Sequence, residues 1–146
     1  MKKKVLFVCT HNSARSQMAE GFLRFLYGDF YEALSAGTEP TGLHPLAVKV
    51  MAEVGIDISQ QKSKSVDEFL NQEIDLVITV CDSAKEKCPY FPFGKKRIHE
   101  SFPDPASIEG SEQDKLEAFR QVRDQIKKWI SETLSPPKLL NSETTG

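Results

Sequence analysis

The sequence lacks a long apolar run, an excess of charge of one sign and a long heptad pattern. Lys2–Lys4 precede only four apolar residues, Val5–Val8, which are too few for the core of a signal peptide or for a membrane span. The 19 basic and 21 acidic residues are interspersed and give a formal net charge of −2, which predicts no nucleic-acid or membrane-surface partner. We therefore expect a cytoplasmic, monomeric protein that binds neither nucleic acid nor membrane.

Cysteine is also scarce, and the number of cysteines is odd. Cys9, Cys81 and Cys88 cannot all pair, and disulfide frameworks are rare in the reducing cytoplasm. Their spacing lacks the CxxC pairs that bind structural zinc, and the three histidines do not cluster with them, so we expect no bound metal. Inert buried thiols and redox chemistry remain as explanations for the three cysteines.

Strand-like and helix-like segments alternate along the 146 residues. Runs rich in β-forming residues predict strands at 5–8, 31–36, 76–80 and 97–100. Apolar residues at helical spacing predict helices at 16–27, 45–54 and 112–134. Ser65, three residues before Glu68, predicts a capping box for a brief helix over 65–70.

This alternation predicts an α/β fold in which a parallel sheet is covered by helices on both faces. The length suits a single domain that buries a full core without disulfides or metal. We expect that domain over residues 1–134. Residues 135–146, with Pro136-Pro137 and a polar end, are expected to form a flexible C-terminal tail.

The stretch Val5–Arg15, VLFVCTHNSAR, joins a strand to a helix through a short loop. Such a loop leaves backbone N–H groups unpaired, and the helix N-terminus adds donors and partial positive charge, so a tetrahedral oxyanion can bind there. Arg15 suits the same anion because its guanidinium is planar and permanently charged. In these surroundings we expect a lowered pKa for Cys9, which makes it a thiolate nucleophile. The alternative is a buried Cys9 that merely ends a strand, with Arg15 on the surface.

A second apolar strand, Leu76–Val80, leads directly into Cys81. The carboxyl ends of parallel strands meet at one edge of a sheet, so Cys9 and Cys81 face one crevice if their strands are neighbours. Cys88 begins an irregular connection to about Lys96, and loops of this length are more often functional than not. If this loop moves, Cys81 can reach Cys9 in one state and Cys88 in another. A buried Cys81 and an unimportant Cys88 are the alternative.

The string CTHNSARSQMAEG over residues 9–21 resembles the phosphate-binding loop of low-molecular-weight protein tyrosine phosphatases and of the arsenate reductases that share their fold. The segments SAGTEP, GIDIS and LVITVCDSAKEKCP and an aspartate-proline turn extend this similarity over nearly the whole expected domain. The extra cysteine pair after the third strand resembles that of the thioredoxin-coupled arsenate reductases. The resemblance implies four parallel strands in the order 2-1-3-4, with Asp104 at the same edge as Cys9 and Cys81.

The resemblance also implies a mechanism for arsenate reduction in arsenic detoxification. Cys9 would attack arsenate, Arg15 and the loop N–H groups would bind its oxygens, and Asp104 would protonate the leaving hydroxide. Cys81 would then attack Cys9 and release arsenite, and Cys88 would move the disulfide to the Cys81–Cys88 pair. Thioredoxin would be the external reductant, and the protein would hold no cofactor.

Supporting roles follow from the same resemblance. Ser16 would hydrogen-bond the nucleophile and keep it ionised, or would serve as a helix N-cap, or both. Asn12 suits the left-handed backbone that such loops require. The other oxyanion-binding residues would act mainly through backbone N–H groups: Thr10, His11, Ser13 and Ala14.

Some members of the family bind a monovalent cation beside this loop. Asn12, Glu20 and Ser35 fit that site, but Lys64 stands where an aspartate ligand would be expected. The Lys64 ammonium could replace the cation beside Glu20, so we expect no dependence on potassium. Glu20 itself is expected to be a solvated or loop-bracing carboxylate.

Two other functions fit parts of this pattern. A low-molecular-weight tyrosine phosphatase needs Cys9, Arg15 and Asp104 but neither Cys81 nor Cys88. A non-enzymatic oxyanion sensor needs only the loop, and the presence of Asp104 and of all three thiols argues against it. Asp104 also has a simpler interpretation as the first residue of an Asp-Pro turn.

Overall fold

Four parallel strands form the centre of the molecule in the computed structural model, which describes residues 2–136. They are β1 (Lys3–Cys9), β2 (Tyr31–Gly37), β3 (Leu76–Thr79) and β4 (Arg97–His99). The order β2-β1-β3-β4 confirms the predicted fold class and strand order. Val5–Val8 in the central strand β1 are fully buried, which explains why this run is apolar without alternation. The predicted tail lies outside the described residues from 137 onward.

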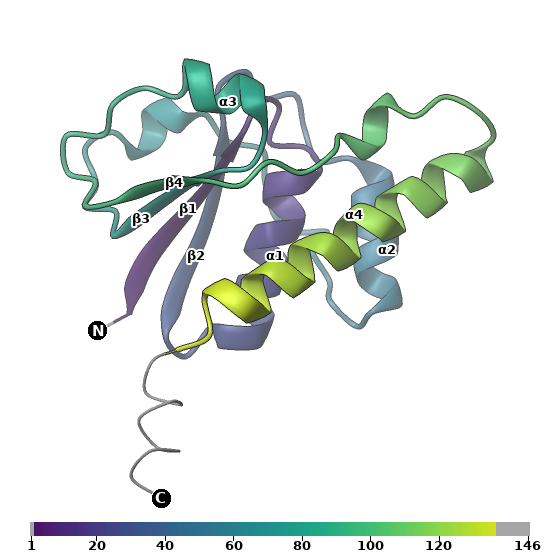
Figure 1. Ribbon diagram of the computed structural model, residues 1–146, viewed down its shortest axis with the longest axis horizontal. Helices are drawn as coiled ribbons and strands as arrows, with labels where there is room; N and C mark the ends of the chain where they lie inside the picture. Colours follow the sequence, from purple (N-terminus) through teal and green to yellow (C-terminus); the bar gives the residue numbers. More distant parts are fainter. Residues whose placement is uncertain (1, 137–146) are drawn as a thin grey trace, which may run out of the picture.

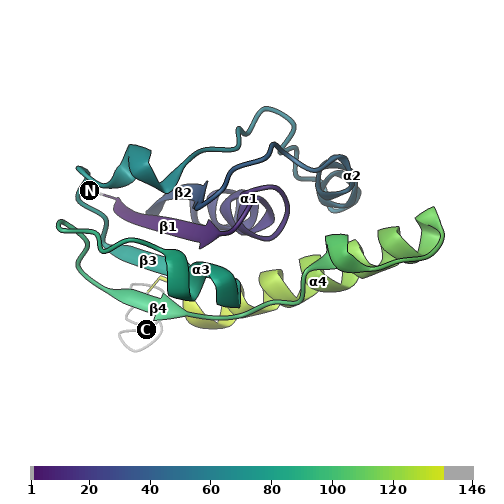
Figure 2. The same ribbon diagram turned by 90° about the horizontal axis from the view of Figure 1, so that it is seen from above.

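Helices cover both faces of the sheet. They are α1 (Arg15–Tyr27), α2 (Pro45–Glu53), η1 (Val66–Phe69), α3 (Asp82–Lys87), η2 (Pro105–Ser107) and α4 (Glu112–Thr133), where η marks a 3-10 helix. Figures 1 and 2 show α1, α2 and α4 together on one side of the sheet and α3 and η1 on the other. Within residues 2–136, none of the helices combines the length and apolar character needed to cross a membrane.

Local sequence signals determine several helix ends. The Ser65 hydroxyl and the Glu68 carboxylate form the predicted capping box at η1. Pro45 begins α2 directly after His44, whose Nδ1 accepts a hydrogen bond from the Leu46 N–H at 3.1 Å. Gly55 follows α2 with a φ of +82°, a left-handed conformation that glycine adopts without strain.

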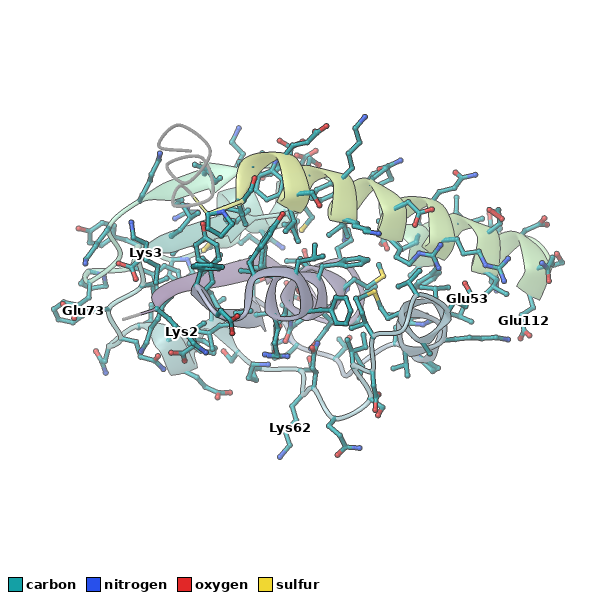
Figure 3. The ribbon with its side chains drawn as sticks, turned by 90° about the horizontal axis from the view of Figure 1, so that it is seen from below. Lys2, Lys3, Glu53, Lys62, Glu73 and Glu112 are labelled. Carbon is teal, nitrogen blue, oxygen red and sulfur yellow. The ribbon has the colours of Figure 1, made fainter. Side chains whose placement is uncertain are left out.

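An ion-pair cluster joins α2 to α4. Glu53, labelled in Figure 3, lies at the end of α2. It accepts from Arg120 Nη2 at 2.7 Å and from Arg123 Nη1 at 2.9 Å. The hydrogen bond from Arg120, with that from Arg123, lowers the pKa of Glu53 to about 2. At the other end of α2, the N-cap residue His44 donates its N–H to Ser13 O at 2.9 Å and so joins this helix to the loop after β1.

The helix α3 was not expected from the sequence, where the connection after β3 had no assigned structure before Cys88. Its six residues form one and a half turns, too short a segment for apolar spacing to reveal. The N-cap is Cys81, whose sulfur accepts from the Ala84 N–H at 3.4 Å, and cysteine is not among the usual N-cap residues. The irregular loop begins after α3, at Cys88, as expected from the sequence.

Candidate active site

Residues 10–14, here called the oxyanion loop, connect β1 to α1. The carbonyl oxygens of Thr10 and Ser13 accept hydrogen bonds at 2.8 and 2.9 Å from backbone N–H groups of the segment after β2. Asn12 has a φ of 49°, which confirms the predicted left-handed backbone. Within the described part of the chain, the loop's own N–H groups donate to no protein acceptor. They are therefore free to donate to a bound anion.

Gly37, the last residue of β2, lies directly against this loop. A Cβ added to Gly37 would lie 2.7 Å from Thr10 O and 2.9 Å from Asn12 N, closer than side chains approach backbone atoms. The approach of the strand to the loop therefore requires glycine. The signal for this role in the sequence is a glycine that directly follows a predicted strand.

An open cavity of about 710 Å³ lies over the oxyanion loop, at the carboxyl ends of the strands. Three segments far apart in sequence line it: Thr10, His11, Arg15, Cys81, Asp82, Ser83, Ser101, Phe102, Pro103 and Asp104. Arg15 Nη1 donates to Phe102 O at 3.1 Å, and Arg15 Nη2 lies 3.9 Å from Asp104 Oδ2. The structure thus brings Arg15, Cys81 and Asp104 to one edge of the sheet, where sequence reasoning placed them.

The two carboxylate oxygens of Asp104 have different surroundings. Oδ1 accepts from the Ala106 N–H at 3.0 Å and caps η2, which is the turn-forming role considered for this residue. Oδ2 faces Arg15 across the cavity, and the side chain is 42% exposed. One oxygen is therefore available to a bound substrate while the other fixes the turn. The general-acid role of Asp104 stays a prediction.

Cys9 and Cys81 form a hydrogen-bonded thiol pair beside the cavity. The bond with Cys81 and burial raise the pKa of Cys9, although Ser16 and Arg15 act in the opposite direction. The same bond lowers the pKa of Cys81 to about 5, with help from Thr10 and the Ala84 N–H. Because Cys9 and Cys81 interact, the pair shares one negative charge, and Arg15 favours the thiolate of either cysteine. The expectation that Cys9 is a thiolate stays a prediction.

Thr10 contributes a hydroxyl that sequence reasoning missed, since only its backbone was assigned a role. Its Oγ1 lies 3.3 Å from the Cys81 sulfur, and the Ala84 N–H lies 3.4 Å from the same atom. Both groups stabilise negative charge on Cys81. Only the pairing of β1 with β3 brings Thr10 and Cys81 together, so this contact cannot be predicted from a local sequence pattern.

Cys88 lies at the C-terminal end of α3, away from the pair. It is 8% exposed, and its N–H donates to Ala84 O at 2.8 Å. Burial raises the pKa of Cys88, so it is a protonated thiol at neutral pH. All three cysteines are free. Of the three predicted catalytic thiols, the structure therefore places Cys9 and Cys81 close together. The helix α3 separates Cys88 from them.

Ser16 is the second residue of α1 and is completely buried. Its Oγ accepts from Asn12 Nδ2 at 2.7 Å, and its bond to Cys9 lowers the pKa of that thiol. The N-cap position belongs to Ala14, which has no side-chain cap, so the N-cap interpretation of Ser16 is wrong. The contact with Cys9 is the one that the resemblance implied.

Glu20, on α1, is buried, and both of its carboxylate oxygens have partners. Its Oε1 accepts from Ser35 Oγ at 2.5 Å and lies 3.8 Å from Lys64 Nζ, while Oε2 pairs with Arg24. Lys64 thus stands beside Glu20, as expected from the sequence. Glu20 is buried, so the expectation of a solvated carboxylate is wrong, and its loop-bracing role stays a prediction.

The histidines outside the loop have structural contacts. His44 caps α2 and packs on Phe119 with ring centroids 4.7 Å apart, and burial lowers the pKa of His44. His99 bonds Thr79 Oγ1 at 2.7 Å and Asp82 Oδ1 at 3.1 Å. Among residues 2–136, no three His, Cys, Asp or Glu side chains are grouped to hold a metal ion.

Comparison with known proteins matches residues 4–144 to the family described as low molecular weight phosphotyrosine protein phosphatase. The chain is 50% identical over 129 residues to an arsenate reductase of Halalkalibacterium halodurans, covering 88% of this chain and 93% of that protein. It is 49% identical over 127 residues to an arsenate reductase of Bacillus subtilis, covering 86% of this chain and 91% of that protein.

Solved structures of both activities share the fold. A structure described as an arsenate reductase in oxidized state superposes with a TM-score of 0.74 at 38% identity, covering 89% of this chain and 95% of that one. A low molecular weight protein tyrosine phosphatase from T. tengcongensis gives a TM-score of 0.76 at 29% identity, covering 91% and 98%. Fold similarity alone therefore does not choose between the two reactions.

Proposed function

The chain belongs to the low molecular weight phosphotyrosine protein phosphatase family, and within it we propose that this protein reduces arsenate to arsenite in arsenic detoxification. The observation that carries the proposal is a second thiol at the oxyanion loop: Cys81 lines the cavity with its sulfur 3.3 Å from Thr10 Oγ1, and Cys88 lies one short helix away. Hydrolysis of a phosphate ester needs one nucleophilic thiol, whereas a two-electron reduction that ends in a disulfide needs two. The identity to the arsenate reductases supports the same choice.

Arsenate binds in the cavity as a tetrahedral oxyanion. The N–H groups of the oxyanion loop and the N-terminus of α1 supply donors and partial positive charge, and Arg15 supplies a full charge. Phosphate has the same shape and charge, so the loop accepts it as well. Slow hydrolysis of aryl phosphates is therefore expected as a side reaction.

In the first step the Cys9 sulfur attacks arsenic and a hydroxide leaves. Cys9 attacks as a thiolate, and the one proton that the pair shares then resides on Cys81. Asp104 protonates the leaving hydroxide, which departs as water. The product is a covalent thiol–arsenate adduct in which arsenic is still pentavalent.

In the second step Cys81, after losing its proton to solvent in the open cavity, attacks the Cys9 sulfur. The sulfur–arsenic bond breaks and arsenic keeps the electron pair, so As(V) becomes As(III) and arsenite is released. Cys9 and Cys81 are oxidised to a disulfide. The Thr10 hydroxyl and the Ala84 N–H stabilise the attacking Cys81 thiolate.

In the third step Cys88 attacks Cys81 and frees Cys9. The two cysteines flank the six-residue helix α3, and seven residues of helix span about 10 Å. A disulfide needs Cα atoms within about 7 Å, so α3 must unwind for this step. The helix is suited to unwinding because it is short and Ala84 is its one buried residue.

Thioredoxin then reduces the Cys81–Cys88 disulfide, in our proposal, and no bound cofactor takes part. Two aromatic side chains close to Cys88 in the sequence support a protein as the reductant, because Tyr90 is 81% and Phe93 is 51% exposed. Exposed apolar side chains of this kind are typical of contact surfaces for other proteins. A small-molecule reductant would not require an exposed apolar contact surface.

A single turnover without reductant tests the proposal. Reduced protein mixed with arsenate should form one arsenite per chain while the number of free thiols falls from three to one. The Cys88→Ser variant should also form one arsenite and lose both remaining thiols, whereas Cys81→Ser should form none. Arsenite formation by Cys81→Ser, or no thiol loss in the wild type, would overturn the proposed relay.

A tyrosine phosphatase is the second candidate, because Arg15 and Asp104 line one cavity, Cys9 directly precedes the loop beneath it, and the phosphatase structure superposes well. In that case an aryl phosphate should be hydrolysed efficiently with all three thiols preserved, and arsenate should be released unchanged. Cys81 and Cys88 would then be dispensable for turnover. The thiol count after exposure to arsenate distinguishes the two functions.

A further inference from the structure

Behind the oxyanion loop lies a row of buried side-chain amides that the reaction above does not use. Gln17, on α1, is completely buried. Its Nε2 donates to Asn12 O at 2.9 Å, to Lys62 O at 3.0 Å and to Asn12 Oδ1 at 3.1 Å. Its Oε1 accepts from Gln61 Nε2 at 2.8 Å. A buried amide with both ends bonded has a fixed orientation, since turning it over would set donors against donors.

The residue at the outer end of this row, Arg24, determines which way the side-chain amides are turned. Arg24 has only donors, and its Nη1 donates to Gln61 Oε1 at 2.9 Å. The Gln61 amide must therefore present Nε2 inward, where it donates to the backbone O and to Oε1 of Gln17, at 3.0 and 2.8 Å. The Gln17 amide in turn must present Nε2 to Asn12. Each donor thus points from the surface toward the loop.

The inner end leads to the nucleophile. Asn12 Oδ1 accepts from Gln17 and also from the backbone N–H of Lys64 at 2.8 Å, so Asn12 Nδ2 must face Ser16. That group donates to Ser16 Oγ at 2.7 Å. Because Ser16 Oγ is an acceptor there, its own hydroxyl proton is available for Cys9, the other group that it bonds.

We propose that Gln17 and Gln61 are positioning residues that orient the Asn12 amide and thereby direct the Ser16 hydroxyl proton at the Cys9 sulfur. The row runs from Arg24 through Gln61, Gln17, Asn12 and Ser16, with every donor aimed toward Cys9. The inference rests on the proposed function only in that Cys9 is the nucleophile, and it holds for reduction and for phosphate-ester hydrolysis alike. If Gln17 loses its amide, Asn12 loses one of the two donors that hold its orientation.

The test measures the pKa of Cys9 where no other thiol contributes. In a Cys81→Ala/Cys88→Ala background Cys9 is the single thiol, and its thiolate absorbance is followed against pH. Gln17→Met, which keeps the length but removes both polar ends, should raise the pKa by about one unit, the scale of one hydrogen bond to a charged sulfur. Gln61→Met should raise it by less. Gln60→Met, an exposed neighbour, is the matched control and should change nothing.

A double-mutant cycle separates positioning from packing. With Ser16→Ala in place, Gln17→Met should have no further effect on the pKa of Cys9, because its influence passes through the Ser16 hydroxyl. Equal shifts with and without Ser16, or no shift in folded Gln17→Met, would overturn the inference. If Gln17→Met does not fold, Gln61→Met and Arg24→Met provide the same test from the less buried end, and unchanged pKa values in both would overturn it.

Neither arsenate nor thioredoxin enters this measurement. A protein that fails to reduce arsenate but shows the expected pKa shifts would overturn the proposed function and leave the positioning role intact. A protein that reduces arsenate with an unshifted pKa in both glutamine variants would do the reverse.

Discussion

Replacing Gly37 with alanine should damage anion binding far more than stability. The added Cβ would lie 2.7 Å from Thr10 O and 2.9 Å from Asn12 N, whereas ordinary contacts begin at 3.4 Å. Relief requires shifts of 0.7 and 0.5 Å, the differences between these distances, and both contacts are to backbone atoms of the oxyanion loop. The loop must therefore move as a unit, and its N–H groups move with it.

A shift of that size should cost about the strength of one hydrogen bond to a charged group, about 1.5–3 kcal/mol. The dissociation constant for inorganic phosphate, measured by calorimetry, should therefore rise about 10- to 100-fold. Gly94→Ala is the matched control because its Cβ would crowd only Phe91, with the nearest atom at 3.1 Å. Unchanged phosphate affinity in folded Gly37→Ala, or equal loss in both variants, would refute the reasoning.

Three further predictions concern stability, ions and the reductant. Hydrogen bonds from Arg120 and Arg123 lower the pKa of Glu53 to about 2 from 4.5, so its stabilisation is complete above pH 4.5 and disappears as the pH falls toward 2. Glu53→Gln should therefore lower the melting temperature by a few degrees at pH 7 and by less at pH 3, and an equal loss at both would contradict this. Potassium should not accelerate turnover over sodium at equal ionic strength, because the Lys64 ammonium already lies 3.8 Å from Glu20; stimulation by potassium would refute that role. Tyr90→Ser should raise the KM for thioredoxin about tenfold with kcat unchanged, and an unchanged KM would exclude Tyr90 from docking.

The sequence predicted the parts of the fold that depend on short-range signals. The unbroken apolar run Val5–Val8 reads as a buried central strand because nothing in it alternates. Asn12 marks a left-handed residue because its short amide tolerates that backbone, and Ser65 with Glu68 marks a helix start. The order of the strands came from the family resemblance, since local patterns carry no information about which strands pair.

The helix α3, in contrast, could not be predicted from short-range signals in the sequence. Its N-cap is the sulfur of Cys81, and Ala84 is the one buried residue among its six. Neither capping statistics nor apolar periodicity can reveal such an element. Its existence matters, because it changes a flexible connection between Cys81 and Cys88 into a folded spacer that must unwind.

The electrostatics of the thiol pair were also beyond local reasoning. Cys9 has the surroundings that lower a thiol pKa, namely a helix N-terminus, Arg15 and Ser16. Cys81 reaches the same surroundings only through the pairing of β1 with β3. A prediction from one segment considered Cys9 alone, whereas in the assembled site the ionisation of Cys9 is tied to that of Cys81.

Gln17 was likewise invisible in the sequence, where it is one polar residue on an amphipathic helix. Its meaning depends on Gln61, which is 44 positions away and arrives through the loop after α2. Buried polar residues of this kind are recognised by the completeness of their hydrogen bonds, which only coordinates supply.

Steady-state arsenate reduction with thioredoxin, thioredoxin reductase and NADPH tests the three-thiol relay in one measurement, with wild type and Cys88→Ser compared side by side. We predict sustained, arsenate-dependent NADPH oxidation by the wild type and no turnover beyond the first by Cys88→Ser, since Cys9 and Cys81 remain locked as a disulfide. Sustained turnover by Cys88→Ser would contradict the relay. No arsenate-dependent oxidation by the wild type, together with efficient hydrolysis of an aryl phosphate, would instead identify a phosphatase.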